Sequence, residues 1–170
     1  AFSFSGLAVR TFSITGTDPV TGLRGSVGDE VSPGASRTGL RIVLDGINTP
    51  AGTNGLNIDA GDTTVQGLVI ARFPGNGIRI TSNSGNTITG NFIGTDITGT
   101  LDLGNGNDGI ELGHSGTTGT IIRGNYIGTN AAGTAAIRNV ADGIGLDGSA
   151  GGGDATGNVD RNNLISANKG

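Results

Sequence analysis

The 170-residue chain contains no cysteine, methionine or tryptophan, and aromatic residues make up only 4% of it. Without cysteine there is no disulfide, no reactive thiolate and no Cys-ligated zinc, which excludes a disulfide-stapled mini-protein. The core must therefore be built from Ile, Leu, Val and Ala with a few Phe residues. Thin, repetitive layers suit such side chains better than a bulky globular centre.

Positive charge is also scarce. Ten Lys and Arg residues stand against 14 Asp and Glu residues, which gives a formal net charge of -4. The basic residues are not clustered, so the chain lacks the positive stripe that neutralises phosphates, and we expect no nucleic-acid partner. No apolar run approaches the roughly 18 residues of a membrane helix, and we expect no membrane span.

Glycine is abundant instead, with 35 residues against four prolines. This is roughly three times the usual glycine share of about 7%. No strict every-third-residue pattern appears, which disfavours collagen, and the low proline content disfavours proline-rich disorder. The length fits a single domain with its own buried core.

A long internal repeat is the most informative feature of the sequence. Residues 86–113 align without a gap on residues 120–147, at a constant offset of 34 that takes Gly90 to Gly124 and Ile110 to Ile144. The phrase Gly-Asn-aromatic-Ile-Gly-Thr begins at Gly90 and again at Gly124. A period of this length is typical of a stacked architecture.

A second phrase, Asn/Asp-Gly followed by two aliphatic residues in alternation, occurs four times, beginning at Asn54, Asn76, Asp108 and Asp142. Apolar alternation occupies residues 65–70, 88–93, 122–127 and 159–165. Such alternation, punctuated by residues that tolerate positive φ, predicts short strands joined by tight turns and argues against helix. Asn-Gly pairs are also typical of antiparallel hairpins, so a hairpin-rich sandwich is an alternative.

A parallel coil explains why the same residue returns at the same place, because equivalent residues then stack at about 4.8 Å. Stacked Asn side chains can hydrogen-bond from coil to coil. We therefore predict two polar ladders and two aliphatic rows. The ladders are Asn91, Asn125, Asn163 and Asn54, Asn76, Asp108, Asp142; the rows are Ile70, Ile93, Ile127, Ile165 and Leu56, Ile78, Ile110, Ile144.

The phrases at Gly90 and Asn76 resemble the "GNxIGTDxxGT" and "NGIxI" phrases of right-handed parallel β-helix repeats in large bacterial extracellular and surface proteins. The pectin-lyase-like superfamily shares that fold. The resemblance covers roughly residues 40–170 and implies right-handedness and a location outside the cell or on its surface. It says little about function, because the fold hosts many activities.

The predicted fold class is all-β: a single-stranded right-handed parallel β-helix, or solenoid, of about five coils. Residues 40–170 form the coils, with long loops at 96–107 and 130–141 projecting from one side. Residues 1–39 form an N-terminal strand or cap region. Its apolar residues of one parity, Phe2, Phe4, Phe12 and Ile14, either cap the chain's own coil or add a strand to a neighbouring copy, which makes them candidate assembly residues.

Asp108 and Asp142 are the candidate site residues, because equivalent positions on adjacent coils bring two carboxylates together. Such a pair suits glycoside hydrolysis or a cation. The competing interpretation, which we favour, is that both replace Asn in a turn ladder. Arg123 and Arg161 are candidate ligand-binding residues that could form a cationic row for an anionic sugar. His114, the only histidine, is a further candidate, and it lies with Arg79 at turns neighbouring the aspartate pair. With one His and no Cys, a catalytic triad and a zinc site are set aside.

The sequence thus predicts a non-catalytic extracellular or cell-surface module with a structural or adhesive role and no cofactor. Its expected partners are copies of itself, which would form fibres through open coil ends, or the rest of a larger surface protein. The alternative is a carbohydrate-active β-helix that binds or cleaves an acidic polysaccharide. An unfinished last coil, with exposed strand edges, motivates the self-assembling form.

Overall fold

The computed structural model describes residues 2–4, 15–17, 24–26, 42–81, 83–113, 117–147, 159–166 and 168. These residues form 16 short strands and no helix, so the described part of the chain is all-β. Fourteen of the strands belong to three parallel sheets, and the other two, β2 (Thr15–Thr17) and β3 (Arg24–Ser26), form an antiparallel pair.

The three parallel sheets are named here by the order in which the repeat visits them. Sheet I contains β1 (Phe2–Phe4), β5 (Leu56–Ile58), β8 (Ile78–Ile80), β11 (Ile110–Gly113) and β14 (Ile144–Asp147). Sheet II contains β6 (Thr64–Gln66), β9 (Thr87–Thr89), β12 (Ile121–Arg123) and β15 (Val159–Arg161). Sheet III contains β4 (Ile42–Asp45), β7 (Leu68–Ala71), β10 (Phe92–Ile93), β13 (Tyr126–Ile127) and β16 (Leu164–Ile165).

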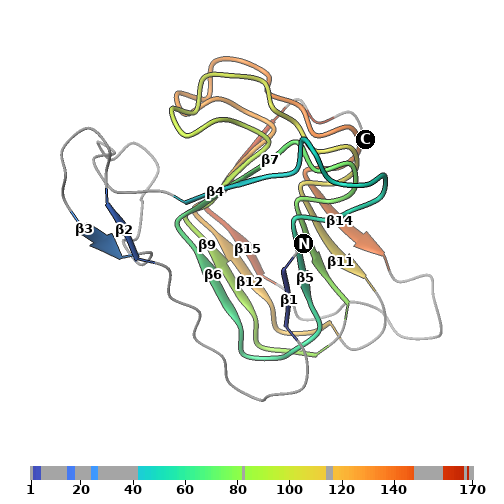
Figure 1. Ribbon diagram of the computed structural model, residues 1–170. Helices are drawn as coiled ribbons and strands as arrows, with labels where there is room; N and C mark the ends of the chain where they lie inside the picture. The colour runs from blue at the N-terminus through green and yellow to red at the C-terminus, as the bar shows by residue number, and fades with distance from the viewer. Residues whose placement is uncertain are drawn as a thin grey trace.

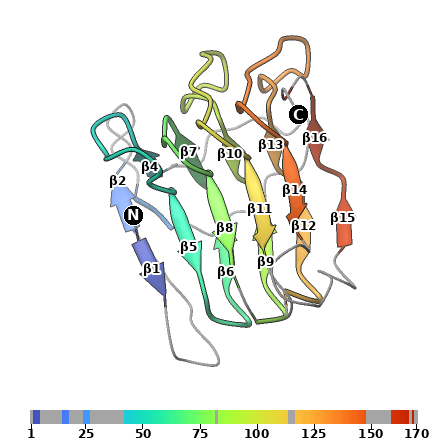
Figure 2. The same cartoon turned by 90° about the vertical axis from the view of Figure 1, so that its right-hand side faces the viewer.

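From β5 onward the chain passes from sheet I to sheet II to sheet III and then returns to sheet I (Figure 1). One strand from each sheet makes a layer, and successive layers stack so that the strands of sheet I lie side by side from β1 to β14 (Figure 2). Every pairing within these sheets is parallel. The hairpin-rich sandwich is therefore wrong for this part of the chain.

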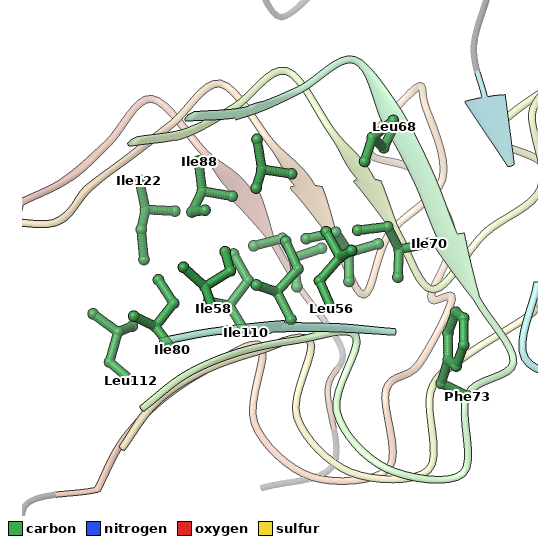
Figure 3. Packing of buried hydrophobic residues seen from close by; sticks show 14 residues of the cluster. Leu56, Ile58, Leu68, Ile70, Phe73, Ile80, Ile88, Ile110, Leu112 and Ile122 are labelled. Atoms are coloured by element: carbon green, nitrogen blue, oxygen red, sulfur yellow. The ribbon is translucent and has the colours of Figure 1, made fainter. Parts of the chain in front are cut away.

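The strand register aligns the predicted aliphatic rows. In sheet I, Leu56 pairs with Ile78, Ile78 with Ile110, and Ile110 with Ile144. In sheet III the corresponding row is Ile70, Ile93, Ile127 and Ile165. Both rows are confirmed. The side chains of their buried members point into a common apolar core between the sheets (Figure 3).

Each predicted alternating segment is broken into two strands, which is a correction to the sequence-based expectation. Residues 88–93 were predicted as one strand, but β9 ends at Thr89 and β10 begins at Phe92. Gly90 lies between them with φ of 63°, a left-handed conformation that turns the chain from sheet II into sheet III. Gly67 and Gly124 make the same corner with φ of 70° and 62°, and Asn162 makes it with φ of 53°.

The first predicted ladder lies at this corner and is confirmed. The backbone N–H and Nδ2 of Asn91 both donate to Oδ1 of Asn125, at 2.9 Å and 3.0 Å. Asn125 makes the same two bonds to Asn163, at 2.8 Å and 2.9 Å. The remaining Nδ2 hydrogen of Asn125 is used as well, because this atom also donates to the carbonyl of Ile88 at 2.9 Å. Asn91 and Asn125 are fully buried, so these bonds satisfy amides that have no access to water.

The effect of removing a core side chain should depend on its layer. Leu112 and Leu146 are paired in sheet I, but Leu112 is fully buried and Leu146 is 62% exposed. We expect Leu112→Ala to lower the free energy of unfolding by about 2–5 kcal/mol, because it leaves a cavity. Leu146→Ala, the matched control, should cost less than about 1 kcal/mol. Urea denaturation measures both, and equal losses would contradict the layer assignment.

The stability of the chain should also depend on each side-chain amide of the ladder formed by Asn91, Asn125 and Asn163. Asn125→Ala leaves both donors of Asn91 and the carbonyl of Ile88 without their buried partner. We expect a loss of roughly 3–5 kcal/mol in unfolding free energy, since each orphaned buried group costs about 1–3 kcal/mol. Asn48 is exposed and serves as the control. Asn48→Ala should stay within about 0.5 kcal/mol of the parent chain, and a similar result for Asn125→Ala would refute the role given to the ladder.

Candidate functional site

The second predicted ladder follows the edge where the chain enters sheet I. Its hydrogen bonds show which structural role Asp108 has. The backbone N–H of Asn76 donates to Oδ1 of Asn54 at 2.7 Å, and that of Asp108 donates to Oδ1 of Asn76 at 3.0 Å. The backbone N–H of Asp142 then donates to Oδ1 of Asp108 at 2.9 Å. Asp108 therefore occupies the position of an asparagine in the ladder, as the favoured interpretation predicted.

A third ladder was missed by the sequence analysis. It lies in the long loops, where the backbone N–H and Nδ2 of Asn105 donate to Oδ1 of Asn139 at 3.1 Å and 3.0 Å. Asn139 donates in the same way to Oδ1 of Asn168, at 3.3 Å and 3.1 Å. Asn105 and Asn139 are fully buried. The signal was present, because these two residues are also separated by the 34-residue repeat.

The outer surface of sheet I carries a polar row that the sequence analysis also did not identify. Arg79 and Glu111 are neighbours in the register of β8 and β11, and Arg79 Nε lies 3.0 Å from Glu111 Oε2. Nδ2 of Asn76 donates to the same Glu111 oxygen. Glu111 is only 12% exposed in its side chain, so the ion pair is partly withdrawn from water. Arg79 thus pairs with Glu111 and not with the predicted Asp108/Asp142 pair.

Beyond Glu111 the polar row ends at a glycine. Gly145 is the register neighbour of Glu111 in β14, and it is buried. A Cβ built on Gly145 would come within 2.7 Å of Oδ2 of Asp108. The lack of a side chain therefore leaves room for the Asp108 carboxylate over β14, between Glu111 and the last layer.

The other candidate ligand-binding residues do not join this surface. Arg123 and Arg161 are paired with each other at the ends of β12 and β15 in sheet II, whereas Asp108 lies at the entrance to sheet I. Arg123 is exposed. His114 lies outside the described residues, so its role stays a prediction. Among the described residues, no three His, Cys, Asp or Glu side chains converge on a point that could hold a metal ion.

The candidate assembly residues are described only in part. Strand β1 pairs in parallel with β5 of the same chain, with Phe2 opposite Leu56 and Phe4 opposite Ile58. These are the register positions of core residues, as a cap on the chain's own coil requires. Phe12 and Ile14 lie outside the described residues, and exchange between copies stays a prediction.

The two long loops, residues 96–107 and 130–141, stack on each other at the edge of the layers, as the yellow and orange traces at the top of Figure 1 show. Antiparallel bridges between Thr95 and Asp102 and between Thr129 and Ala136 close each loop at its base. The backbone N–H of Ala131 donates to the carbonyl of Gly99 at 2.8 Å and joins the two loops. The loops therefore continue the layered order beyond the sheets.

Asp96 organises the first loop. Burial favours its protonated form, but the N–H groups of Leu101, Thr100 and Thr98 and the Thr98 hydroxyl outweigh this effect and lower the pKa of Asp96 to about 2. The N–H groups of Thr100 and Leu101 both lie 2.8 Å from Oδ1. In the second loop Asn130 takes the place of Asp96 and accepts the corresponding N–H groups of Thr134 and Ala135 at 2.8 Å and 3.2 Å.

The last layer differs from those beneath it because several of its inward positions are exposed. Leu146 is 62% exposed although its partner Leu112 is fully buried, and Ile165 is 39% exposed although its partner Ile127 is fully buried. In sheet II the inward row changes from the buried Ile122 to an exposed Asp160. Strands β14, β15 and β16 each pair on one side only within the described sheets. Within the described part of the chain, this last layer therefore combines exposed apolar side chains with strand edges that no described strand covers.

Comparison with known protein families, with curated proteins and with solved structures gives no match to this chain. None of the described residues forms a helix able to cross a membrane. The site is therefore defined by its geometry alone.

The Asp96 carboxylate makes the stability of the first loop depend on pH. The neutral side chain of Asn130 gives the second loop no such dependence. The pKa of Asp96 in the folded chain, about 2, lies below the usual aspartate pKa of 3.8. The stabilisation is therefore present above about pH 4 and lost as the pH falls through about 2. Asp96→Asn should be less stable than the parent chain at pH 5, because charge-assisted hydrogen bonds are lost. The difference should shrink as the pH approaches 2. Urea denaturation across this range measures it, and a constant difference would contradict the assignment.

Proposed function

We propose that this chain is a non-catalytic structural module, a right-handed parallel β-helix that acts outside the cell or on its surface. The stacked parallel sheets support the β-helix assignment. The right-handedness rests on the resemblance of the repeat phrases and on the strong preference for right-handed connections between parallel strands of one sheet. The extracellular location rests on that same resemblance.

The observation that carries the proposal is the exposed last layer. Leu146 and Ile165 continue rows that are fully buried one layer below. The edges of β14, β15 and β16 present backbone donors and acceptors in parallel register, which is a template for further strands. We infer that the partner is a second copy of this chain, or a further repeat of the same kind in a larger surface protein, because only another such layer matches three edges at once.

The buried polar residues support a structural role over a catalytic one. Asn91, Asn125, Asn105 and Asn139 are fully buried, and all of them bond to the adjoining layer. Asp108, the candidate catalytic residue, accepts a backbone N–H as its asparagine counterparts do. The distinctive residues of the repeat are thus accounted for by stacking.

Particle size as a function of concentration tests self-assembly. The parent chain should form particles that lengthen along one axis, visible by electron microscopy and light scattering. Leu146→Lys places a charge on the exposed last layer and should leave the chain monomeric. Ile97→Lys is the matched control, because Ile97 is 47% exposed but lies on the first long loop, and it should assemble normally. A parent chain that stays monomeric at every concentration, or a Leu146→Lys chain that assembles, would overturn the self-association model.

A second candidate is binding or cleavage of an acidic polysaccharide on the outer surface of sheet I. It is favoured by the polar row of Arg79 and Glu111 beside Asp108. We expect Arg79, and not Asp142, to be the residue on which such binding depends. Titration with uronate polymers should then show binding that Arg79→Gln abolishes and Arg138→Gln, a change in the second loop, preserves. The absence of binding and of product release with every polymer would exclude this candidate.

A further inference from the structure

A further row of buried polar residues lines the corner where the chain passes from sheet I to sheet II, at the lower edge of Figure 2. Three successive layers contribute one member each: Thr63 before β6, Asn86 before β9 and Thr120 before β12. The carbonyls of Thr63 and Asn86 accept the N–H groups of Thr87 and Ile121, both at 2.8 Å, so the members are stacked. Asn86 and Thr120 are fully buried. Bulk water therefore has no access to Asn86.

The asparagines at the corner between sheets II and III show how a stacked amide is normally satisfied. Oδ1 of Asn91 accepts the N–H of Leu68 in the layer before, at 3.0 Å. Nδ2 of Asn91 donates to the carbonyl of Val65 at 3.1 Å and to Oδ1 of Asn125 at 3.0 Å. Nδ2 of Asn125 donates to the carbonyl of Ile88 and to the next asparagine of the ladder, both at 2.9 Å. Each Nδ2 thus bonds to the layer before and to the layer after.

Asn86 follows this pattern only through its oxygen. Oδ1 accepts the N–H of Thr63 at 3.0 Å, which fixes the orientation of the amide, because exchanging its oxygen and nitrogen would set two donors against each other. Nδ2 is buried and has no hydrogen-bond partner in the described part of the chain. The carbonyl that corresponds to that of Val65 belongs to Ala60, three residues before Thr63, and Nδ2 does not bond to it.

The layer after Asn86 offers a threonine where the other ladders offer an asparagine. The hydroxyl oxygen of Thr120 is attached to Cβ, so it lies one bond closer to the backbone than Oδ1 of an asparagine would. Nδ2 of Asn86 does not form a hydrogen bond with it. Both acceptors that satisfy Nδ2 in the other ladders are thus out of its reach, and a buried amide donor left in this way is unfavourable.

We propose that the corner between Asn86 and Thr120 is a binding site for one internal water molecule. The water accepts a hydrogen from Nδ2 of Asn86 and donates its own two hydrogens to the carbonyl of Ala60 and to Oγ1 of Thr120. All three protein groups are neutral, so the site calls for a neutral ligand that both accepts and donates. Three polar partners are typical of an internal water. Ala60 is buried as well, with 3% of its surface exposed, so the site is enclosed.

This water joins three successive layers, as an asparagine side chain does at the corner between sheets II and III. Ala60 precedes β6, Asn86 precedes β9 and Thr120 precedes β12. Because the site is enclosed, the water exchanges with solvent only when these layers separate locally, and its residence time is much longer than that of surface water. The inference concerns the interior of the stack and does not rest on the proposed function.

Cross-relaxation between water and side-chain amides, measured by NMR on the isotope-labelled chain, tests the site. We expect the Nδ2 hydrogens of Asn86 to show cross-peaks with water whose sign is that of a long-lived contact and not of chemical exchange. Asn125 is the internal control, because it is equally buried and its Nδ2 bonds to protein groups. It should show no such peak. A spectrum without the peak at Asn86, or with an equal peak at Asn125, would overturn the proposal.

Two variants at position 120 test the role given to the hydroxyl. Thr120→Val replaces the hydroxyl by a methyl group of similar size, whereas Thr120→Ser keeps the hydroxyl and is the matched control. Oxygen-17 relaxation dispersion counts long-lived waters and is not affected by hydrogens that exchange through a hydroxyl. We expect the signal of Thr120→Val to fall by one water per chain and that of Thr120→Ser to equal the parent. An unchanged signal in Thr120→Val, or an equal fall in both variants, would refute the site.

Discussion

The hydrogen bond from the side chain of one layer to the backbone of the next is the interaction on which this structure depends. Each corner between sheets II and III removes backbone groups from water, and an asparagine there supplies one acceptor and two donors that reach the layers on either side. Because such bonds require the same residue at the same height in every layer, they impose the repeat. The aliphatic rows then come into register, and the core follows from the stacking.

The dependence of each layer on its neighbours also explains why the proposed interaction surface is the last described layer. A layer inside the stack has partners on both sides, whereas the last described layer presents exposed leucine and isoleucine side chains and edges that no described strand covers. The proposed self-association arises from this asymmetry.

Much of this arrangement could be predicted from the sequence. The two ladders, the two aliphatic rows and the two projecting loops were predicted because a fixed offset aligns equivalent residues whatever the local geometry. The break at Gly90-Asn91 was missed, because apolar alternation continues through a corner and gives no sign of the left-handed glycine. The pairing of Arg79 with Glu111 was missed as well, because it depends on the register between β8 and β11.

The sequence by itself determined the stacking of short strands and the residues that repeat in each layer, because periodic identity is visible without coordinates. Only the tertiary structure decided that three sheets and not two enclose the core, and which carboxylate lies beside which cation. It also decided that Leu146 is exposed where Leu112 is buried, although both occupy one position in the repeat. The physical reason is that burial and hydrogen bonding in a stack depend on the layers above and below, and not on the residues adjacent in the chain.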